Sequence, residues 1–226
     1  MRERRYDRRV QESDRANAER LRAALSRERV PPSELRAALT SVPLLDRDAW
    51  LDVVFGLEEL PDDEPTLPPG CVPYLPCPVD ALLHVVDHAE VRSSDVFVDV
   101  GSGVGRAAAL VHLLTDATAI GIEIQPALVA EARALMRRLN VDRVSSIEGD
   151  AVARTDVLTK GTVFFLYCPF SGERLEKVLD ALEGIARARP IRVCCVGLAP
   201  LSRPWLALLA EPANDVTLYR STLTPR

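Results

Sequence analysis

The sequence predicts an α/β protein in which a doubly wound, mostly parallel sheet follows a helical N-terminal extension. Between Val96 and Leu223, short apolar runs alternate with longer amphipathic segments, as in the βαβ units that build a parallel sheet. One of these runs, "TVFFLYCPF", is apolar almost throughout, as expected for a strand buried on both faces. Three glycines in the five residues from Gly101 to Gly105 separate a strand from a helix and indicate a ligand-binding turn.

Length and composition limit the architecture to one full α/β domain with an additional end. The chain has 226 residues, of which 47% are hydrophobic, and this is enough for one large core. The formal net charge of -5 argues against a general nucleic-acid-binding protein, which is usually basic. Residues 1–30 differ, with ten Arg against six acidic residues. A solvated helix of mixed charge explains that end, and docking to an acidic partner or to nucleic acid stays open as an alternative.

Nothing in the sequence predicts a membrane segment. The longest apolar runs have about eight residues, against the roughly 20 that span a bilayer. The arginines near the start are not followed by the apolar stretch of a signal peptide. The five cysteines are an odd number and two of them are adjacent, which does not suit a disulfide framework. We therefore expect a cytoplasmic protein with reduced cysteines.

Three helices are predicted near the N-terminus. The first is polar and is stopped by two consecutive prolines, and the second begins just after them. The third, "RDAWLDVVF", is expected to be capped by Asp46 and to end at Gly56. Their expected ranges are 3–28, 33–40 and 47–55.

A proline-rich segment follows these helices. It has seven prolines between Pro61 and Pro78, which make it stiff and irregular. It also carries Tyr74, Leu75 and two cysteines, so we expect it to pack against the rest of the chain. We place the domain boundary at its end, with a helical and proline-rich cap over residues 1–78 and the ligand-binding domain over 79–226.

The remaining elements alternate along the chain. Strands are expected at 96–100, 117–124, 144–150, 162–170, 191–199 and 215–223. Helices are expected at 79–91, 104–114, 126–140 and 172–189. The segment from Trp205 to Ala210 is too short for periodicity to separate a helix from a strand that forms a hairpin with 216–223.

The spacing of the glycines distinguishes between ligands. The motif is D-x-G-x-G-x-G, led by Asp99, whereas a dinucleotide fingerprint needs glycine at position 106, which is Arg. A pyrophosphate would be repelled by the carboxylate of Asp99, but a ligand with an ammonium group would be attracted. The motif therefore favours S-adenosylmethionine, which carries an amino-acid end and a sulfonium in place of phosphates.

Two further acids stand where this ligand needs them. Glu123 ends the second strand, where a carboxylate can accept both ribose hydroxyls at roughly 1.5–3 kcal/mol per hydrogen bond. Asp150 ends the third strand and can accept from the adenine amino group. The glycine turn together with these acids predicts a cofactor site far more specifically than the turn alone.

From about Val79 to Leu223 the chain resembles the class I S-adenosylmethionine-dependent methyltransferases, which have a Rossmann-like fold. The resemblance is carried by "VDVGSGVGR", "GIEIQ", "EGDA" and "FLYCPF". It implies S-adenosylmethionine as the cofactor, S-adenosylhomocysteine as the product, and a set of cofactor-binding residues. These are Asp99, Gly101, Ser102, Gly103, Gly105, Glu123, Ile124, Gly149, Asp150, Ala151 and Tyr167.

A narrower resemblance concerns the protein-lysine methyltransferases of the histone type that lack a SET domain, and their mitochondrial and bacterial relatives. "YLPCP" upstream of the glycine turn, with "ALVAEAR" and "LYCPF" downstream, carries it. It implies that the segment from Tyr74 to Pro76 lies close to the cofactor. One departure concerns the fourth strand, where methyltransferases of amide or base nitrogens usually carry [DN]-P-P-[YF]. Here the residues from Tyr167 to Phe170 read "YCPF", which argues against DNA adenine or glutamine as acceptor.

Three residues are candidates for the catalytic step. Tyr74, Tyr167 and Phe170 could line the acceptor pocket, where aromatic rings suit an ammonium or lysine. Packing explains Tyr74 equally well and explains Phe170 better. Glu173 could act as a base, but an acid at a helix start has a structural explanation too. Cys168 as a nucleophile is a weaker alternative to pocket lining.

No metal is expected. Cys71, Cys77, His84 and His88 could together bind zinc only at a spacing that matches no common zinc site. We expect methyl transfer to a protein side chain such as lysine, or to a small metabolite. An inactive cofactor-binding or scaffold protein and an RNA methyltransferase are the alternatives. A homodimer through the N-terminal helices is a further expectation.

Overall fold

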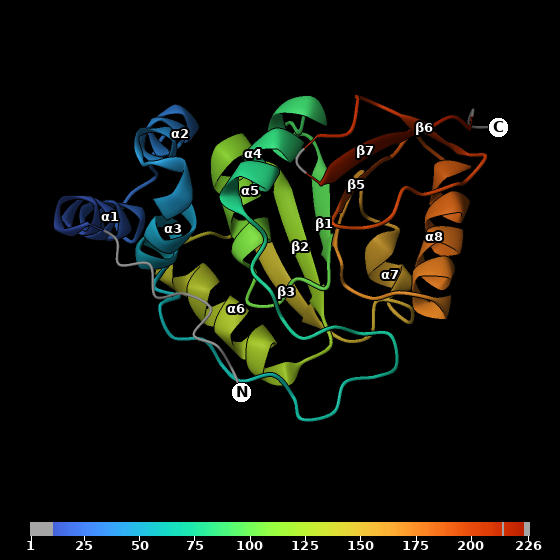
Figure 1. The fold of residues 1–226 in the computed structure, drawn as a ribbon, viewed down its shortest axis with the longest axis horizontal. Helices are drawn as coiled ribbons and strands as arrows, with labels where there is room; N and C mark the ends of the chain where they lie inside the picture. Colours follow the sequence, from blue (N-terminus) through green and yellow to red (C-terminus); the bar gives the residue numbers. More distant parts are fainter. Residues whose placement is uncertain (1–10, 214, 224–226) are drawn as a thin grey trace.

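A seven-stranded sheet forms the centre of the computed structural model, which describes residues 11–213 and 215–223 (Figure 1). Its strand order is β3-β2-β1-β4-β5-β7-β6. The first five strands are parallel, while β7 runs antiparallel to both β5 and β6. The strands are β1 (Val96–Val100), β2 (Thr118–Glu123), β3 (Val144–Glu148), β4 (Val163–Tyr167), β5 (Arg192–Val196), β6 (Leu206–Leu208) and β7 (Val216–Ser221). The predicted fold class is confirmed, and the segment from Trp205 to Ala210 contains a hairpin strand, not a helix.

Helices cover both faces of the sheet. One face packs against α4 (Val79–His88), α5 (Arg106–Thr115) and α6 (Pro126–Arg138), and the other packs against α7 (Thr155–Leu158) and α8 (Glu173–Ala186). Strand β4 shows why its sequence is apolar throughout, because Phe165 points to the first face and Phe164 to the second. Helix α7 was not predicted, since four residues are too few to show a helical period.

The N-terminal helices pack outside α4 and α5 and share their hydrophobic cluster. They are α1 (Glu12–Leu25), α2 (Pro32–Ser41) and α3 (Arg47–Phe55), with a 3₁₀ turn, η1 (Leu44–Asp46), before α3. The part of the first predicted helix before residue 11 lies outside the described residues. Gly56 ends α3 in the left-handed conformation as predicted, with φ of 68°.

The predicted cap at Asp46 is wrong. Its side chain makes no capping hydrogen bond to α3. Asp46 is the last residue of η1, with φ of -106° and ψ of -10°, so the chain enters α3 from a turn that is already helical. An N-cap residue usually has an extended backbone, from which its side chain can reach the first amide groups.

Arg106, the first residue of α5, connects the N-terminal helices to the sheet. The side chain is only 3% exposed. Its Nε lies 2.7 Å from Oδ1 of Asp52, and its Nη2 lies 3.0 Å from Oδ1 of Asp48, both on α3. Its Nη1 donates to the carbonyl oxygen of Cys77 at 2.6 Å. Position 106 therefore carries a buried cation that docks α3 beside the glycine turn.

We call residues 57–78, between α3 and α4, the strap. Figure 1 shows it in teal, passing along one end of the sheet and back toward α4. Two side chains hold it there. Asp63 accepts from the amide of Tyr74 at 2.8 Å and from Nε2 of Gln125 at 3.1 Å. Gln125 in turn accepts from the amide of Glu64 at 2.7 Å. The strap is thus packed against the sheet domain, in spite of its irregular backbone.

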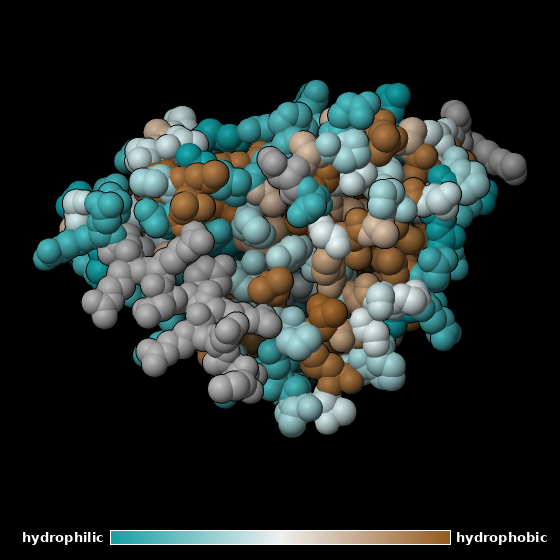
Figure 2. Space-filling model, in the orientation of Figure 1, coloured by the Kyte–Doolittle hydropathy of each residue, from teal (hydrophilic) through white to brown (hydrophobic). Residues whose placement is uncertain are grey.

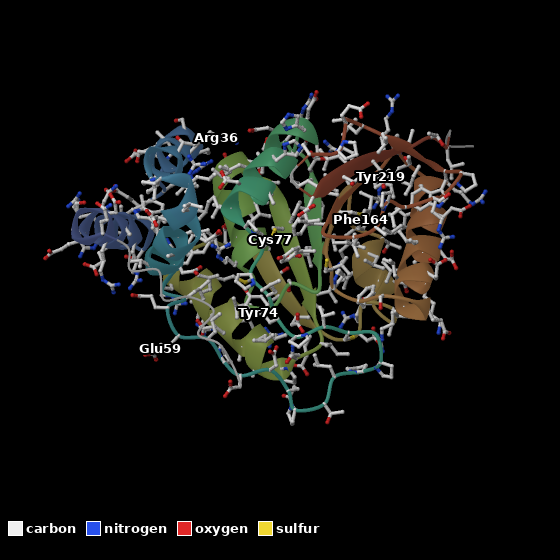
Figure 3. All side chains as sticks on the ribbon, viewed as in Figure 1. Arg36, Glu59, Tyr74, Cys77, Phe164 and Tyr219 are labelled. Carbon is white, nitrogen blue, oxygen red and sulfur yellow. The ribbon has the colours of Figure 1, made fainter. Side chains whose placement is uncertain are left out.

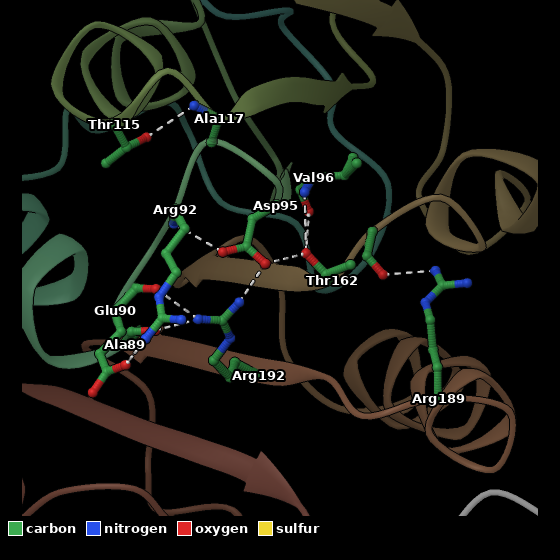
Figure 4. Close-up of polar contacts among 11 residues, drawn as sticks. Ala89, Glu90, Arg92, Asp95, Val96, Thr115, Ala117, Thr162, Arg189 and Arg192 are labelled. Atoms are coloured by element: carbon green, nitrogen blue, oxygen red, sulfur yellow. Dashed lines mark hydrogen bonds and ion pairs between the residues drawn. The ribbon is translucent and has the colours of Figure 1, made fainter.

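The opposite end of the sheet is closed by a polar cluster around Asp95 (Figure 4). Asp95 accepts from the amide of Arg92 and from Oγ1 of Thr162, both at 2.8 Å, and it pairs with Arg192. Burial raises the pKa of Asp95, but these hydrogen bonds outweigh burial and hold its pKa below the usual value. The cluster connects the starts of β1, β4 and β5. We therefore assign it a structural role.

Candidate functional site

A cavity of about 320 Å³ lies at the carboxyl ends of β1 to β4, under the strap. The sheet order reverses between β1 and β4, and open α/β sheets bind ligands at such a point. Figure 2 shows brown, hydrophobic residues in the area where Figure 1 draws the strap and these strand ends. The strap contributes Leu67, Cys71, Val72, Pro73, Tyr74 and Leu75 to the lining.

Eight of the predicted site residues line this one cavity, although they come from distant parts of the sequence. They are Tyr74, Gly101, Glu123, Ile124, Gly149, Asp150, Ala151 and Tyr167. The other predicted cofactor residues lie under or behind the glycine turn. Asp99 and Ser102 are buried, and the Ser102 hydroxyl packs against Gly121. Gly103 is covered by the strap, and Gly105 packs against Ala132.

The glycine turn needs glycine for two reasons. Gly101 has φ of 80° and Gly103 has φ of 52°, in the left-handed region that side chains disfavour. A Cβ on Gly101 would also lie 2.6 Å from Cβ of Pro169, and one on Gly103 would lie 2.1 Å from ring carbons of Tyr74. The Tyr74 ring therefore lies directly on the turn, near the centre of the view in Figure 3. Pro169 and Tyr74 therefore pack so close to the backbone of the turn that only glycine fits at positions 101 and 103.

Glu123 holds the turn in place. Its Oε2 accepts from the amide of Gly103 at 2.8 Å, and its Oε1 accepts from the amide of Gln125 at 2.9 Å. Burial raises the pKa of Glu123, and these two hydrogen bonds lower it in part. The amide of Ile124 also lowers the pKa of Glu123. A carboxylate can accept about four hydrogen bonds, so Glu123 keeps acceptor capacity for a ligand.

Asp99 lies buried beneath the turn, close enough to Glu123 for their charges to interact. Burial, and then the charge of Glu123, raise the pKa of Asp99 to about 7. Two buried acids with raised pKa values create a site where a cationic ligand is electrostatically favoured.

Two polar residues of the cavity wall, Gln125 and Arg174, were not predicted from the sequence. Arg174 lies in the first turn of α8, and its Nη1 is 2.7 Å from Oδ1 of Asp150. A cation in the first turn of a helix is opposed by the helix dipole, and this was a signal in the sequence. Gln125 gave no such signal, because it acts through the strap, which is distant in sequence.

The structure places Glu173 outside the cavity, which corrects its assignment as a catalytic candidate. Its side chain is 82% exposed and its Oε1 lies 2.7 Å from Nζ of Lys177. The hydrogen bond from Lys177 lowers the pKa of Glu173, so it is a weaker base than a free carboxylate. Glu173 points to solvent from the start of α8, and this agrees with the structural explanation of an acid at that position.

Cys168 lines the cavity in a strained conformation. Its φ is 41°, and its Sγ donates to the carbonyl oxygen of Gly197 at 2.9 Å. Burial raises the pKa of Cys168, so its sulfur is held as a thiol. This favours pocket lining over a nucleophilic role.

The described residues contain no group of three or more His, Cys, Asp or Glu side chains placed to hold a metal ion. His84 and His88 stack on each other with ring centroids 3.9 Å apart. None of the helices in the described ranges is long and apolar enough to cross a membrane.

The fold and the position of the cavity define a class of protein. The chain has the fold of the class I S-adenosylmethionine-dependent methyltransferases, as the sequence predicted. Over residues 76–146, from the end of the strap to β3, it matches the family described as histone methylation protein DOT1. The predicted similarity to histone-type methyltransferases without a SET domain is thus confirmed for this segment.

Solved structures extend the likeness. An RNA methyltransferase from Salinibacter ruber, crystallised with S-adenosylhomocysteine, is 26% identical with a TM-score of 0.52, over 67% of this chain and 95% of that one. A precorrin-6y C5,15-methyltransferase from Geobacter metallireducens is 16% identical with a TM-score of 0.50, over 68% of this chain and 93% of that one. A mutant of MtNAS is 13% identical with a TM-score of 0.52, over 93% and 71%. The last two show the fold alone. No curated protein matches the chain.

Proposed function

We propose that this protein is an S-adenosylmethionine-dependent methyltransferase that methylates a nucleophile on a protein side chain, such as lysine, or on a small metabolite. One observation carries the proposal. Gly101 of the glycine turn, Glu123 at the end of β2 and Asp150 just after β3 line one cavity, although they are far apart in sequence. The residues fit the cofactor, because Gly101 presents no side chain to the cavity and the buried carboxylate of Glu123 beside it keeps acceptor capacity.

Each part of the cofactor has a matching group in this cavity or directly beneath the glycine turn. Glu123 keeps acceptor capacity for the ribose hydroxyls, and Asp150 can accept from the adenine amino group. The negative charges of Asp99 and Glu123 suit the ammonium group of the methionine end. When bound, S-adenosylmethionine supplies a methyl group activated by the sulfonium. The protein then has mainly to position the acceptor, which can contribute several kcal/mol to lowering the barrier.

The wall beside β4 supports an amine or another compact nucleophile as the acceptor. Tyr74, Tyr167, Pro169 and Phe170 make this wall uncharged and largely aromatic. Such rings attract an ammonium group and pack along a lysine side chain. An amide acceptor would need the Asp or Asn of the [DN]-P-P-[YF] motif, whose position is taken by Tyr167 in this chain. We assign Tyr74 and Tyr167 to acceptor positioning, and we leave Glu173 out of the catalytic site.

Two domains divide these tasks in our proposal. Residues 79–226 hold the cofactor, and the cap over residues 1–78 selects the acceptor through the strap. The strap supports this assignment, because six of its residues line the cavity and Val72 and Leu75 are also exposed beside it.

RNA methylation is the second candidate, favoured by the 26% identity to the RNA methyltransferase from Salinibacter ruber. The net charge of -5 opposes it. Binding to RNA would weaken steeply as salt is added, whereas binding to a protein or metabolite would weaken far less.

The first test is calorimetric titration of the protein with S-adenosylmethionine and S-adenosylhomocysteine. We expect micromolar binding that Glu123→Ala weakens at least tenfold, or about 1.4 kcal/mol. Because Glu123 also holds two amides, circular dichroism must show that the variant is folded. Transfer of a labelled methyl group to proteins, RNA and metabolites then identifies the acceptor. A folded wild-type protein that binds neither ligand would overturn the proposal, and binding without turnover on any acceptor would favour the scaffold alternative.

A further inference from the structure

Arg174 joins three separate parts of the cavity wall. It lies in the first turn of α8 and reaches Asp150, which follows β3, with Nη1 2.7 Å from Oδ1. Its Nε donates to the carbonyl oxygen of Pro69 in the strap at 3.2 Å. The two side chains are 21% and 30% exposed, so the pair is shielded more than an open surface pair. Arg174 and Asp150 both line the cavity.

The strap is fastened to the same wall beside this pair. The amide of Ser171 donates to the carbonyl oxygen of Gly70 at 3.0 Å, and Cys71 forms an antiparallel bridge with Phe170. Arg174 continues this contact from the strap to the end of β3. The strap therefore cannot leave this end of the cavity without breaking the hydrogen bond to Arg174.

Asp150 is oriented by two donors on one oxygen. Its Oδ1 accepts from Arg174 and from the amide of Val152, the latter at 3.1 Å. Among the described residues, no hydrogen bond falls on Oδ2, which keeps its acceptor capacity for a ligand. An ionised carboxylate only accepts hydrogen bonds. It therefore suits an exocyclic amino group and repels an exocyclic oxygen.

We propose that Arg174 is a specificity-determining positioning residue, which fixes Asp150 and the strap together so that the cavity selects a purine with an exocyclic amino group. This inference rests on the proposed function and assigns a residue that the glycine turn and the strand-end acids do not include. Arg174 acts through Asp150. Its loss should change the preference between two bases, and not merely the overall affinity.

The test compares S-adenosylhomocysteine with S-inosylhomocysteine, which has an oxygen in place of the amino group. Calorimetry on the full chain should show that the wild type prefers the adenosyl ligand at least 100-fold. Arg174→Gln should weaken binding of the adenosyl ligand at least tenfold. It should weaken binding of the inosyl ligand no more than threefold. Arg174→Lys should recover part of the preference, because it keeps the charge without the planar fork. Lys177→Gln is the matched control on α8, where the pair with Glu173 is exposed, and it should bind like the wild type.

Asp150→Asn provides an independent test. Its side-chain amide can donate to the oxygen of the inosyl ligand, so the preference for the adenosyl ligand should fall at least tenfold. The ratio of the two affinities decides the result. If Arg174→Gln weakens both ligands by the same factor, Arg174 is only a structural clamp and the inference is overturned. If the wild type binds both ligands equally, base selection is overturned while the cofactor site stands. If the folded wild type binds neither, the proposed function and this inference both fail.

Discussion

Replacing Arg106 with Leu removes the cation that two carboxylates of α3 share. Asp48 and Asp52 are half-buried, and Arg106 also donates to the carbonyl oxygen of Cys77. Removal of one partner from a buried ion pair typically costs about 3–5 kcal/mol, because a charge stays behind without its partner. Most domains have only about 5–15 kcal/mol of stability, so the loss should be large.

Urea denaturation at pH 7 measures this loss, with Trp50 in α3 as a fluorescent reporter of the cap. With a slope of about 2–3 kcal/mol per molar, the midpoint of Arg106→Leu should fall by about 1–2 M. The matched control is Arg36→Leu on α2, where Figure 3 labels Arg36. This change breaks the exposed pair with Asp87 on α4. Those side chains are 34% and 50% exposed, so the control should lose no more than about 1 kcal/mol.

A pH series makes the test stricter. Burial raises the pKa of Asp52 even with Arg106 present, and removal of the cation raises it further. As the pH falls, the folded variant takes up a proton on Asp52 before the unfolded chain does, because the pKa of Asp52 is raised in the folded state. The deficit relative to wild type should therefore shrink on acidification. The role of Arg106 in docking α3 would be refuted by either of two results. One is that Arg106→Leu is as stable as Arg36→Leu, and the other is that its stability deficit does not shrink as the pH falls.

Three further predictions concern Gly103, Asp99 and Glu173. Gly103→Ala should weaken the binding of S-adenosylhomocysteine at least tenfold in calorimetry, because the new Cβ would lie 2.1 Å from the Tyr74 ring and displace it. Unchanged affinity would mean that binding does not need the ring at this position. Burial raises the folded-state pKa of Asp99 to about 7, so the folded protein keeps a proton that the unfolded chain loses near pH 4. Stability without ligand should therefore fall as pH rises from 4 through 7, and Asp99→Asn should flatten that slope in thermal melts, whereas parallel slopes would contradict the shift. Glu173→Gln should change methyl transfer less than twofold, since the side chain is 82% exposed, and a tenfold loss of turnover would return it to the site.

The sheet and the strand-end acids could be predicted because their signals are local. The predicted strand at residues 96–100 and helix at 47–55 agree with the bounds of β1 and α3, where apolar patterning or a terminal glycine marks the ends. Parallel strands bring their carboxyl ends to one edge, so Glu123 and Asp150 reach one cavity whatever the details of the loops.

The errors have a different physical origin. Arg174 and Gln125 act on strap residues more than 60 positions away in the sequence, and no local pattern encodes such a contact. Asp46 has the side chain of a helix cap but the backbone of a preceding turn. Glu173 follows β4 closely in sequence, but the first turn of α8 directs it to solvent.

The adjacency of Gly105 and Arg106 links the assembly of the cap to the affinity for ligand. The turn that would cradle the cofactor continues directly into the residue that anchors α3 and the end of the strap. By thermodynamic linkage, a ligand that binds only with the cap docked also stabilises the docked cap, by about 2.7 kcal/mol at 100 times its Kd. We therefore expect cofactor to protect the N-terminal helices from proteolysis. The sheet domain without residues 1–78 should be a weaker binder, because it would lack the strap over the cavity and the carboxylates of α3 that hold Arg106 beside the glycine turn.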